Sequence, residues 1–222
     1  MGLHWRAGVH AVAIDEDLVL LDEASDAYVC LLGGAKVLAG RGRTGRAGAP
    51  SDEGLVFTPP HAADDLVAAG LLSAQPPPRV ATGLPPPARS RLYRVGGVRP
   101  SLGESLTFLR LAAGTARDIA RRPMGGLLEE LRGQPLAPAQ WRSLAEACAV
   151  FDRLIAWGPF DGACLFRSVL RRRFLAALGH PSLLVLGVRT WPFRAHCWLQ
   201  SGQSVLDDWP ERVAAYRPIL VV

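Results

Sequence analysis

Short runs of apolar residues dominate the beginning of the chain, and each is followed by polar or turn-forming residues. Residues 3–6, 9–14 and 17–22 have the length and composition of β-strands. Asp15 and Glu16 form the expected tight turn between the last two strands. The pattern therefore predicts a small antiparallel sheet at the N-terminus.

Two helices are expected to follow these strands. Residues 24–32 are mostly apolar, and residues 61–72 repeat apolar positions at helical spacing. One face of the second helix carries Leu66, Val67, Leu71 and Leu72. Three strands followed by helices make a winged-helix-like unit, which we place at residues 1–75.

A proline-rich stretch separates this unit from the rest of the chain. Residues 76–91 hold two runs of three prolines, which form stiff, extended segments. The remainder, residues 92–222, is long enough to bury a core of its own. We therefore expect two domains joined by a linker.

The second domain opens with helical patterns over residues 101–121, 124–131 and 137–157. Ser101 and Glu104 have the spacing of a capping box, which marks the start of the first of these helices. That helix carries an apolar stripe that is expected to pack into the domain, formed by Leu102, Leu106, Leu109, Ala113 and Ala116.

A further helical pattern places a cysteine where a reactive thiolate could form. Asp161 can cap the start of this helix, and Gly179 can end it in the left-handed conformation. Cys164 falls in the first turn, where unpaired backbone N–H groups and the positive end of the helix dipole favour a thiolate over a thiol. The sequence thus indicates a candidate nucleophile.

Strands carrying a histidine and an aspartate follow that helix. Residues 182–190 and 194–201 are short apolar runs bounded by turn residues, and His196 lies in the second. A third short run ends at Asp207 and Asp208. In a tight hairpin the imidazole can face one of these carboxylates, which gives an α+β domain with the nucleophile, base and orienting group of a cysteine hydrolase.

Three motifs bring these positions together: Cys164-Leu165-Phe166-Arg167-Ser168, His196-Cys197-Trp198 and Val205-Leu206-Asp207-Asp208. From about Tyr93 onward the chain resembles the transglutaminase-like leader peptidase of lasso-peptide biosynthesis, often called the B protein. The family pattern is a Cys-Leu-x-Arg-Ser opening, a His-Ala-Trp strand and an Asp after the next turn.

The resemblance implies a transglutaminase-like, papain-like fold in which Cys164 is the nucleophile, His196 the base and Asp208 the orienting carboxylate. It further implies that the substrate is a lasso precursor peptide, whose leader is cleaved off. The new core N-terminus would then pass to a partner, the ATP-dependent, asparagine-synthetase-like lasso cyclase.

Alternatives stay open at several of these positions. Asp207 competes with Asp208, although strand alternation points it to the other face. His180 follows a helix end, where a charge–dipole role suffices. Cys197 replaces the alanine of the family, and alternation is expected to point it away from the face of His196. Cys30 and Cys148 fit the pattern of small buried hydrophobes, respectively in the first and the second domain.

The N-terminal unit has a second resemblance. Leu20-Leu21-Asp22, followed by residues 26–31, is similar to the PqqD-like peptide-recognition element, named after the small carrier-like protein of pyrroloquinoline quinone biosynthesis. That family binds a leader peptide as an added strand packed on its last helix, and an exposed strand edge is a ready template for such pairing. On this chain the resemblance implies leader contacts at Leu18, Val19, Leu20, Leu21, Leu66, Val67 and Gly70.

Composition and charge narrow the function further. The net charge is +5, but residues 1–80 carry 6 basic and 10 acidic side chains (6 − 10 = −4), and residues 81–222 carry 19 and 10 (19 − 10 = +9). The acidic first unit argues against nucleic-acid binding. Four cysteines without a Cys-x-x-Cys pair argue against a zinc site, and no cofactor is expected.

No run of 18 uncharged apolar residues and no signal-peptide pattern occur, so no membrane span and a cytoplasmic location are expected. Two other function classes remain: a peptide-binding protein with a degenerate catalytic domain, and a winged-helix nucleic-acid binder.

Overall fold

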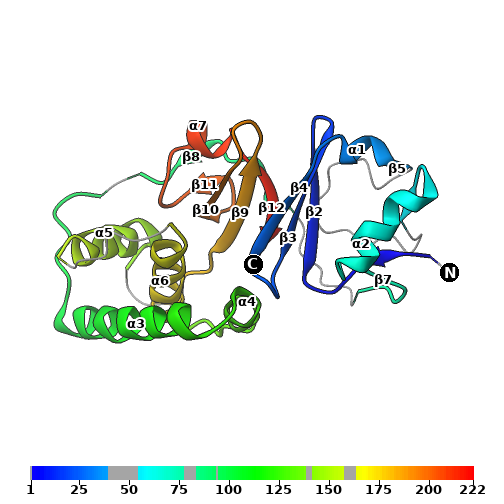
Figure 1. Cartoon of the computed structure of the whole chain (residues 1–222). Coiled ribbons are helices and arrows are strands. Elements are labelled where there is room, and N and C mark those ends of the chain that lie inside the picture. Colours follow the sequence, from blue (N-terminus) through cyan, green and yellow to red (C-terminus); the bar gives the residue numbers. More distant parts are fainter. Residues whose placement is uncertain (1, 40–54, 78–83, 94, 139–141, 158–163) are drawn as a thin grey trace.

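The computed structural model describes residues 2–39, 55–77, 84–93, 95–138, 142–157 and 164–222. It has an α+β fold in which a small N-terminal unit stands beside a larger helix-and-sheet unit (Figure 1). Three strands, β2 (Val9–Ile14), β3 (Asp17–Asp22) and β4 (Ala27–Leu31), form the antiparallel sheet of the first unit in the order β2-β3-β4.

Short elements complete the N-terminal unit on one face of this sheet. They are β1 (His4–Trp5), α1 (Gly34–Val37), β5 (Leu38–Ala39), β6 (Val56–Phe57), η2 (Pro60–Ala63), α2 (Asp64–Ala68) and β7 (Leu72–Ser73). Strand β1 pairs with β7, and β5 pairs with β6. The expected first strand is therefore confirmed, but its partner is β7, far along the chain.

The helix expected at residues 24–32 is wrong. Asp26 has a positive φ of 54° and ends a turn, after which β4 pairs with β3. Tyr28 and Cys30 pack toward the larger unit, while Val29 and Leu31 pack toward the small helices. Both faces of the strand contact apolar groups, so the alternation that marks a half-exposed strand is missing from the sequence.

The single helix expected at residues 61–72 is divided in the structure. A turn of 3₁₀-helix, η2, leads into α2, and Gly70 follows with a positive φ of 68°. A left-handed residue ends a helix because the next N–H can no longer continue the α-helical ladder. Leu71 and Leu72 therefore lie beyond the helix, where both are buried.

Four long helices lie among the described residues of the larger unit: α3 (Leu102–Arg121), α4 (Met124–Arg132), α5 (Leu144–Ile155) and α6 (Cys164–Ala177). The predicted capping box of α3 is present, with the Ser101 N–H donating to Glu104 and the Glu104 N–H donating to Ser101. Helix α5 begins at Leu144, later than the expected residue 137, because Ser143 and Glu146 form a second capping box there.

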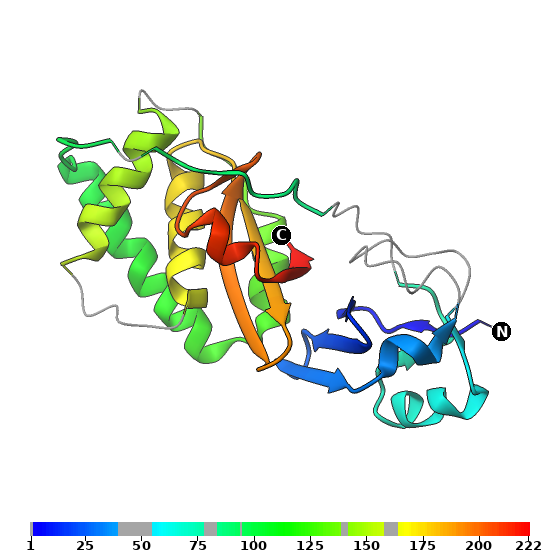
Figure 2. The same ribbon diagram turned by 90° about the horizontal axis from the view of Figure 1, so that it is seen from above.

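The sheet of the larger unit has the order β12-β9-β10-β11-β8, with β9 (Leu183–Arg189) and β10 (Arg194–Ser201) at its centre. Both are close to the predicted ranges. The outer strands are β8 (Ser90–Arg91), β11 (Ser204–Val205) and β12 (Arg217–Val221), of which the sequence analysis missed β8 and β12. The large helices lie on one side of this sheet, and α7 (Pro210–Val213) lies on the other (Figure 2).

The two units share one hydrophobic core. Val12, Val19 and Leu21 of the N-terminal sheet belong to the same buried cluster as Phe151 and Phe174 of α5 and α6. The opposite face of the N-terminal sheet packs on its own short elements. The N-terminal sheet is therefore attached to the larger unit by a continuous apolar contact as well as through residues 76–91.

The apolar stripe expected to pack α3 into the domain faces outward instead. Leu102, Leu106 and Leu109 are 85%, 68% and 59% exposed, whereas Phe108 and Ala112 are buried. Polar residues of α3 are buried beside them because two arginines, one in α6 and one just before α5, form hydrogen bonds and ion pairs with them. The Arg173 guanidinium donates to Thr115 Oγ1 at 2.9 Å and to Asp118 Oδ2 at 2.8 Å, and Arg142 pairs with Glu104.

Candidate active site

The candidate nucleophile is the first residue of α6. Cys164 is exposed, and its backbone lies in the first turn, where N–H groups are not used by the helix ladder. The Asp161 cap proposed for this helix lies outside the described residues. Helix α6 packs on β10, and a hydrogen bond fixes the contact: Ser168 Oγ donates to Asp207 Oδ2 at 2.9 Å.

His196 and Asp208 are brought together as the spacing predicted. The His196 ring nitrogen Nε2 lies 2.5 Å from Asp208 Oδ2, and the Trp209 N–H donates to the other carboxylate oxygen at 2.8 Å. The imidazole lies near the rings of Trp198 and Tyr216, with centroids at 6.1 Å and 5.2 Å. The ring is thus held in one orientation by a carboxylate and by aromatic neighbours.

The sulfur of Cys164 and the ring of His196 interact. The pKa of Cys164 is lowered to about 4, first by a hydrogen bond with the Cys197 side chain, then by one with His196. The pKa of His196 is raised, first by Cys164 and also by the Asp208 carboxylate, against the effect of burial. Because Asp208 occupies Nε2, Nδ1 is the ring nitrogen left for the sulfur. These shifts favour a thiolate–imidazolium pair near neutral pH.

Cys197 points away from the face of His196, as strand alternation predicted, but it nevertheless contacts the sulfur of Cys164. Its side chain faces the α6 side of β10, and its thiol and backbone N–H both interact with Cys164. The pKa of Cys197 is raised by that contact and by burial, so it stays a thiol and can donate to the thiolate. Alternation along β10 was read correctly, but α6 begins so close to the strand that residues on both of its faces reach the sulfur.

The choice between the two aspartates is also clear in the geometry. Asp207 points to the other face, where it accepts from the Leu199 N–H at 2.8 Å and from Ser168. Its pKa is raised by burial. Asp208, and not Asp207, contacts His196.

The remaining histidine and cysteine candidates lie elsewhere. His180 follows Gly179, whose positive φ of 82° agrees with the predicted helix end, and this places His180 at the end of α6 opposite Cys164. Cys148 is buried in α5, and burial raises its pKa to about 11. Cys30 is half-buried on β4, with its pKa raised by burial.

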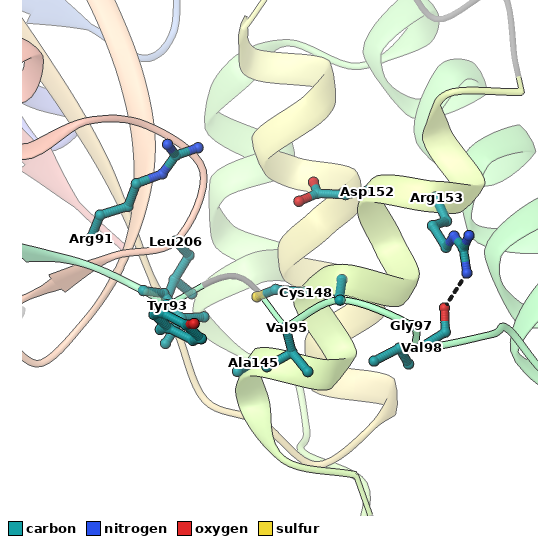
Figure 3. A pocket seen from close by; sticks show the side chains of 13 residues that line it. Arg91, Tyr93, Val95, Gly97, Val98, Ala145, Cys148, Asp152, Arg153 and Leu206 are labelled. Atoms are coloured by element: carbon teal, nitrogen blue, oxygen red, sulfur yellow. Dashed lines mark hydrogen bonds between the residues drawn. The ribbon is translucent and has the colours of Figure 1, made fainter.

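A cavity of about 300 Å³ lies between α5 and the segment that follows β8 (Figure 3). Cys148 and Asp152 form part of its wall on α5, and Leu206 contributes from the other side. Neither Cys164 nor His196 lines this cavity, so it is separate from the catalytic cluster. Within the described ranges, no three His, Cys, Asp or Glu side chains gather as metal ligands would.

The residues expected to bind a leader are only partly placed for that role. Leu18, Val19, Leu20 and Leu21 lie in β3, the central strand, which pairs with β2 on one edge and with β4 on the other. Their side chains are fully buried or nearly so. No peptide can add to that strand, so the expectation of an exposed edge there is wrong.

The two edge strands of this sheet are β2 and β4, and β4 is the segment that was expected to be a helix. Among the described residues, no strand pairs with the outer side of either, but β12 packs beside β2, so β4 is the more open edge. On α2, Leu66 is buried in the same cluster that Val29 and Leu31 of β4 pack against, whereas Val67 is 47% exposed. Gly70 lies just beyond α2, and leader contacts at Leu66, Val67 and Gly70 stay a prediction.

Tyr28 is a residue near the site that the sequence analysis missed. It lies on β4, and its ring centroid is 5.6 Å from that of Phe193 at the β9–β10 turn. Its pKa is raised to about 12, first by burial and then by electrostatic interactions with Cys197 and Cys164. No local signal identifies this residue, because its position depends on how the two units pack together.

Comparisons with known proteins identify the family of the larger unit. Residues 106–221 match the family model described as the transglutaminase-like superfamily, and the matched segment includes Cys164, His196 and Asp208. The chain is 39% identical over 51 residues to the Microcin J25-processing protein McjB of Escherichia coli; this segment is 23% of the chain. The match spans only 24% of the length of that relative. No solved structure matches the chain.

Proposed function

Because the chain belongs to the transglutaminase-like superfamily, we propose that it is a cysteine peptidase that removes the leader from a lasso-peptide precursor. The observation that carries this proposal is the Cys164 thiol at the start of α6, facing an imidazole that is held by Asp208. The similarity to a protein named for processing microcin J25 supports a peptide precursor as the substrate.

The chemistry follows from the positions of the three groups. The Cys164 thiolate attacks the carbonyl carbon of the scissile peptide bond, and the backbone N–H of Cys164 stabilises the oxyanion at the helix N-terminus. The His196 imidazolium donates its proton to the departing amine, which leaves a thioester on Cys164. Neutral His196 then takes a proton from water, which hydrolyses the thioester, and Asp208 orients the ring in both steps.

The leader would bind to the N-terminal unit as a PqqD-like recognition element. Its strand would add to the outer edge of β4 and pack against α2 near Leu66, Val67 and Gly70. Tyr28 on that strand packs against Phe193 at the β9–β10 turn, so a leader bound there would lie beside the sheet that carries His196. Binding by this unit would raise the local concentration of the scissile bond.

The product would be a core peptide with a free N-terminus. By the resemblance to lasso B proteins, the partner that consumes it would be an ATP-dependent cyclase that forms the macrolactam.

No helix among the described residues combines the length and hydropathy needed to cross a membrane.

The test is cleavage of a candidate precursor by the full chain, followed by mass spectrometry. The proposal expects a single cut between leader and core, abolished in Cys164→Ala and retained in Cys148→Ala, which removes a buried thiol outside the cluster. Leader binding, measured by fluorescence anisotropy, should persist in Cys164→Ala. Binding without any cleavage by the wild-type chain would instead identify a non-catalytic peptide-binding protein.

A further inference from the structure

The outer face of α3 carries a continuous apolar stripe that no described residue covers. Its large members are Leu102, Leu106 and Leu109, each more than half exposed. The stripe continues through Ala113, Ala116 and Ala120, all exposed. Along α3 the spacing alternates between four and three residues, the pattern by which one helix presents a straight seam to another.

This face cannot be turned inward by rotating the helix. Arg142 and Arg173 bind Glu104 and Asp118 on the opposite side of α3, and Phe108 packs between the rings of Phe151 and Phe174. Rotation of α3 would break these buried ion pairs. Each break would leave a buried charge without its partner, which strongly destabilises a fold. Figure 1 shows α3 along the outer edge of the molecule, with α5 and α6 on its inner side.

A row of cations runs along one side of the stripe. Arg110, Arg117 and Arg121 each follow a stripe position by one residue, which turns them about 100° around the helix axis onto the same flank. All three are exposed, and none forms an ion pair or side-chain hydrogen bond with a described residue. By contrast, the neighbouring Arg122 pairs with Glu130 at 2.9 Å.

We propose that this face of α3 is a docking surface for an amphipathic helix of another protein, with apolar residues at the same four–three spacing and an acidic flank. The leucines would supply apolar burial at one end. The alanines at the other end would let the two backbones approach closely, and the three arginines would pair with the acidic flank of the partner.

Two other occupants fit the same face less well. A second copy of the chain would bring its own Arg110, Arg117 and Arg121 to the seam, and like charges there are unfavourable. An anionic membrane would attract the arginines, but half of the stripe is alanine, which buries little apolar area in lipid. The oligomeric state of the chain and its binding to anionic vesicles distinguish these two occupants from a partner helix.

The experiment uses the full chain and two synthetic helical peptides with leucines at four–three spacing, one flanked by glutamates and the other by lysines. Fluorescence anisotropy measures binding. We expect the glutamate peptide to bind the wild-type chain and the lysine peptide to bind at least about tenfold more weakly. Leu106→Glu/Leu109→Glu should abolish binding, and Arg110→Glu/Arg117→Glu should reverse the preference between the two peptides.

Three results would overturn the proposal: no binding of the glutamate peptide, equal binding of both peptides, or an unchanged preference in the arginine variant. Sedimentation that shows a wild-type dimer lost in Leu106→Glu/Leu109→Glu would assign the face to a second copy. Flotation with phosphatidylserine vesicles, lost in the same variant, would assign it to a membrane. The substituted positions are exposed, and precursor cleavage should be unchanged, which separates this proposal from the catalytic one.

Discussion

The proposed catalytic cluster and the proposed leader-binding edge are encoded in different ways. Cys164, His196 and Asp208 are each placed by a local signal: a helix start, a position in a strand, and a residue after a short turn. The edge of β4 depends on the order of strands in the whole sheet. A local signature therefore locates catalytic groups, whereas a docking edge has to be found from topology. A substitution in the Cys164 cluster should therefore lower cleavage without changing leader affinity, and a substitution at the recognition unit should lower leader affinity without changing the chemical step.

The largest effect is expected for His196→Ala. Without the imidazole, the thiolate loses a charged partner and the departing amine loses its proton donor, so kcat/KM should fall by about 10⁴-fold. Steady-state cleavage of the precursor measures this loss, with circular dichroism as a check on folding. Leader affinity should stay within about twofold of wild type, and a parallel loss of affinity would contradict the separation of the two regions.

The next effect contrasts the two neighbouring aspartates. Asp208→Asn should lower kcat by about a hundredfold or more, because the ring of His196 loses its orienting carboxylate. Asp207→Asn should change kcat by only a few-fold, but lower the free energy of unfolding by about 1–3 kcal/mol through its buried contacts with Leu199 and Ser168. Equal kcat losses in the two variants would refute the assignment.

A smaller effect is expected at the recognition unit. Val67→Asp places a charge on the exposed face of α2, and should raise KM for the full precursor about tenfold with little change in kcat. A short peptide that spans the cleavage site but lacks the leader should be cut at the wild-type rate. A lowered kcat for that short peptide would show that α2 acts on the catalytic centre as well.

The smallest effect concerns Cys197. Its thiol makes the largest contribution to stabilising the Cys164 thiolate, so Cys197→Ala should raise the pKa of Cys164 from about 4. Activity needs the thiolate, present above that pKa, and the imidazolium, present below the raised pKa of His196. The acid limb of kcat/KM against pH should therefore move to higher pH while the alkaline limb shifts much less. An unmoved acid limb would show that His196 alone holds the thiolate.

The sequence was sufficient for much of the larger unit. A capping box located the start of α3, turn residues bounded β9 and β10, and the motifs that carry Cys164, His196 and Asp208 are recognisable in the sequence alone. The sequence did not predict β4 as a strand, because both of its faces contact apolar groups and its residues therefore do not alternate between apolar and polar. It also did not predict which face of α3 is buried. Both faces of α3 contain apolar residues, and the choice between them depends on distant arginines, Arg142 and Arg173.

The contact between Cys197 and Cys164 was missed for a related reason. Strand alternation gives the face on which a side chain lies, but it does not say how close a helix start will come to that face. Tyr28 shows the same limit, because its nearness to the cysteines arises from packing between two units.

The proposed chemistry requires Cys164 to be a thiolate at neutral pH. This is tested by its rate of alkylation by iodoacetamide as a function of pH, followed by mass spectrometry of the cysteine-containing peptides. We expect Cys164 to react at a nearly constant rate from about pH 5 upward, while Cys148, with a pKa of about 11, stays largely unmodified. A Cys164 rate that rises only near the ordinary thiol pKa of about 8.5 would contradict it.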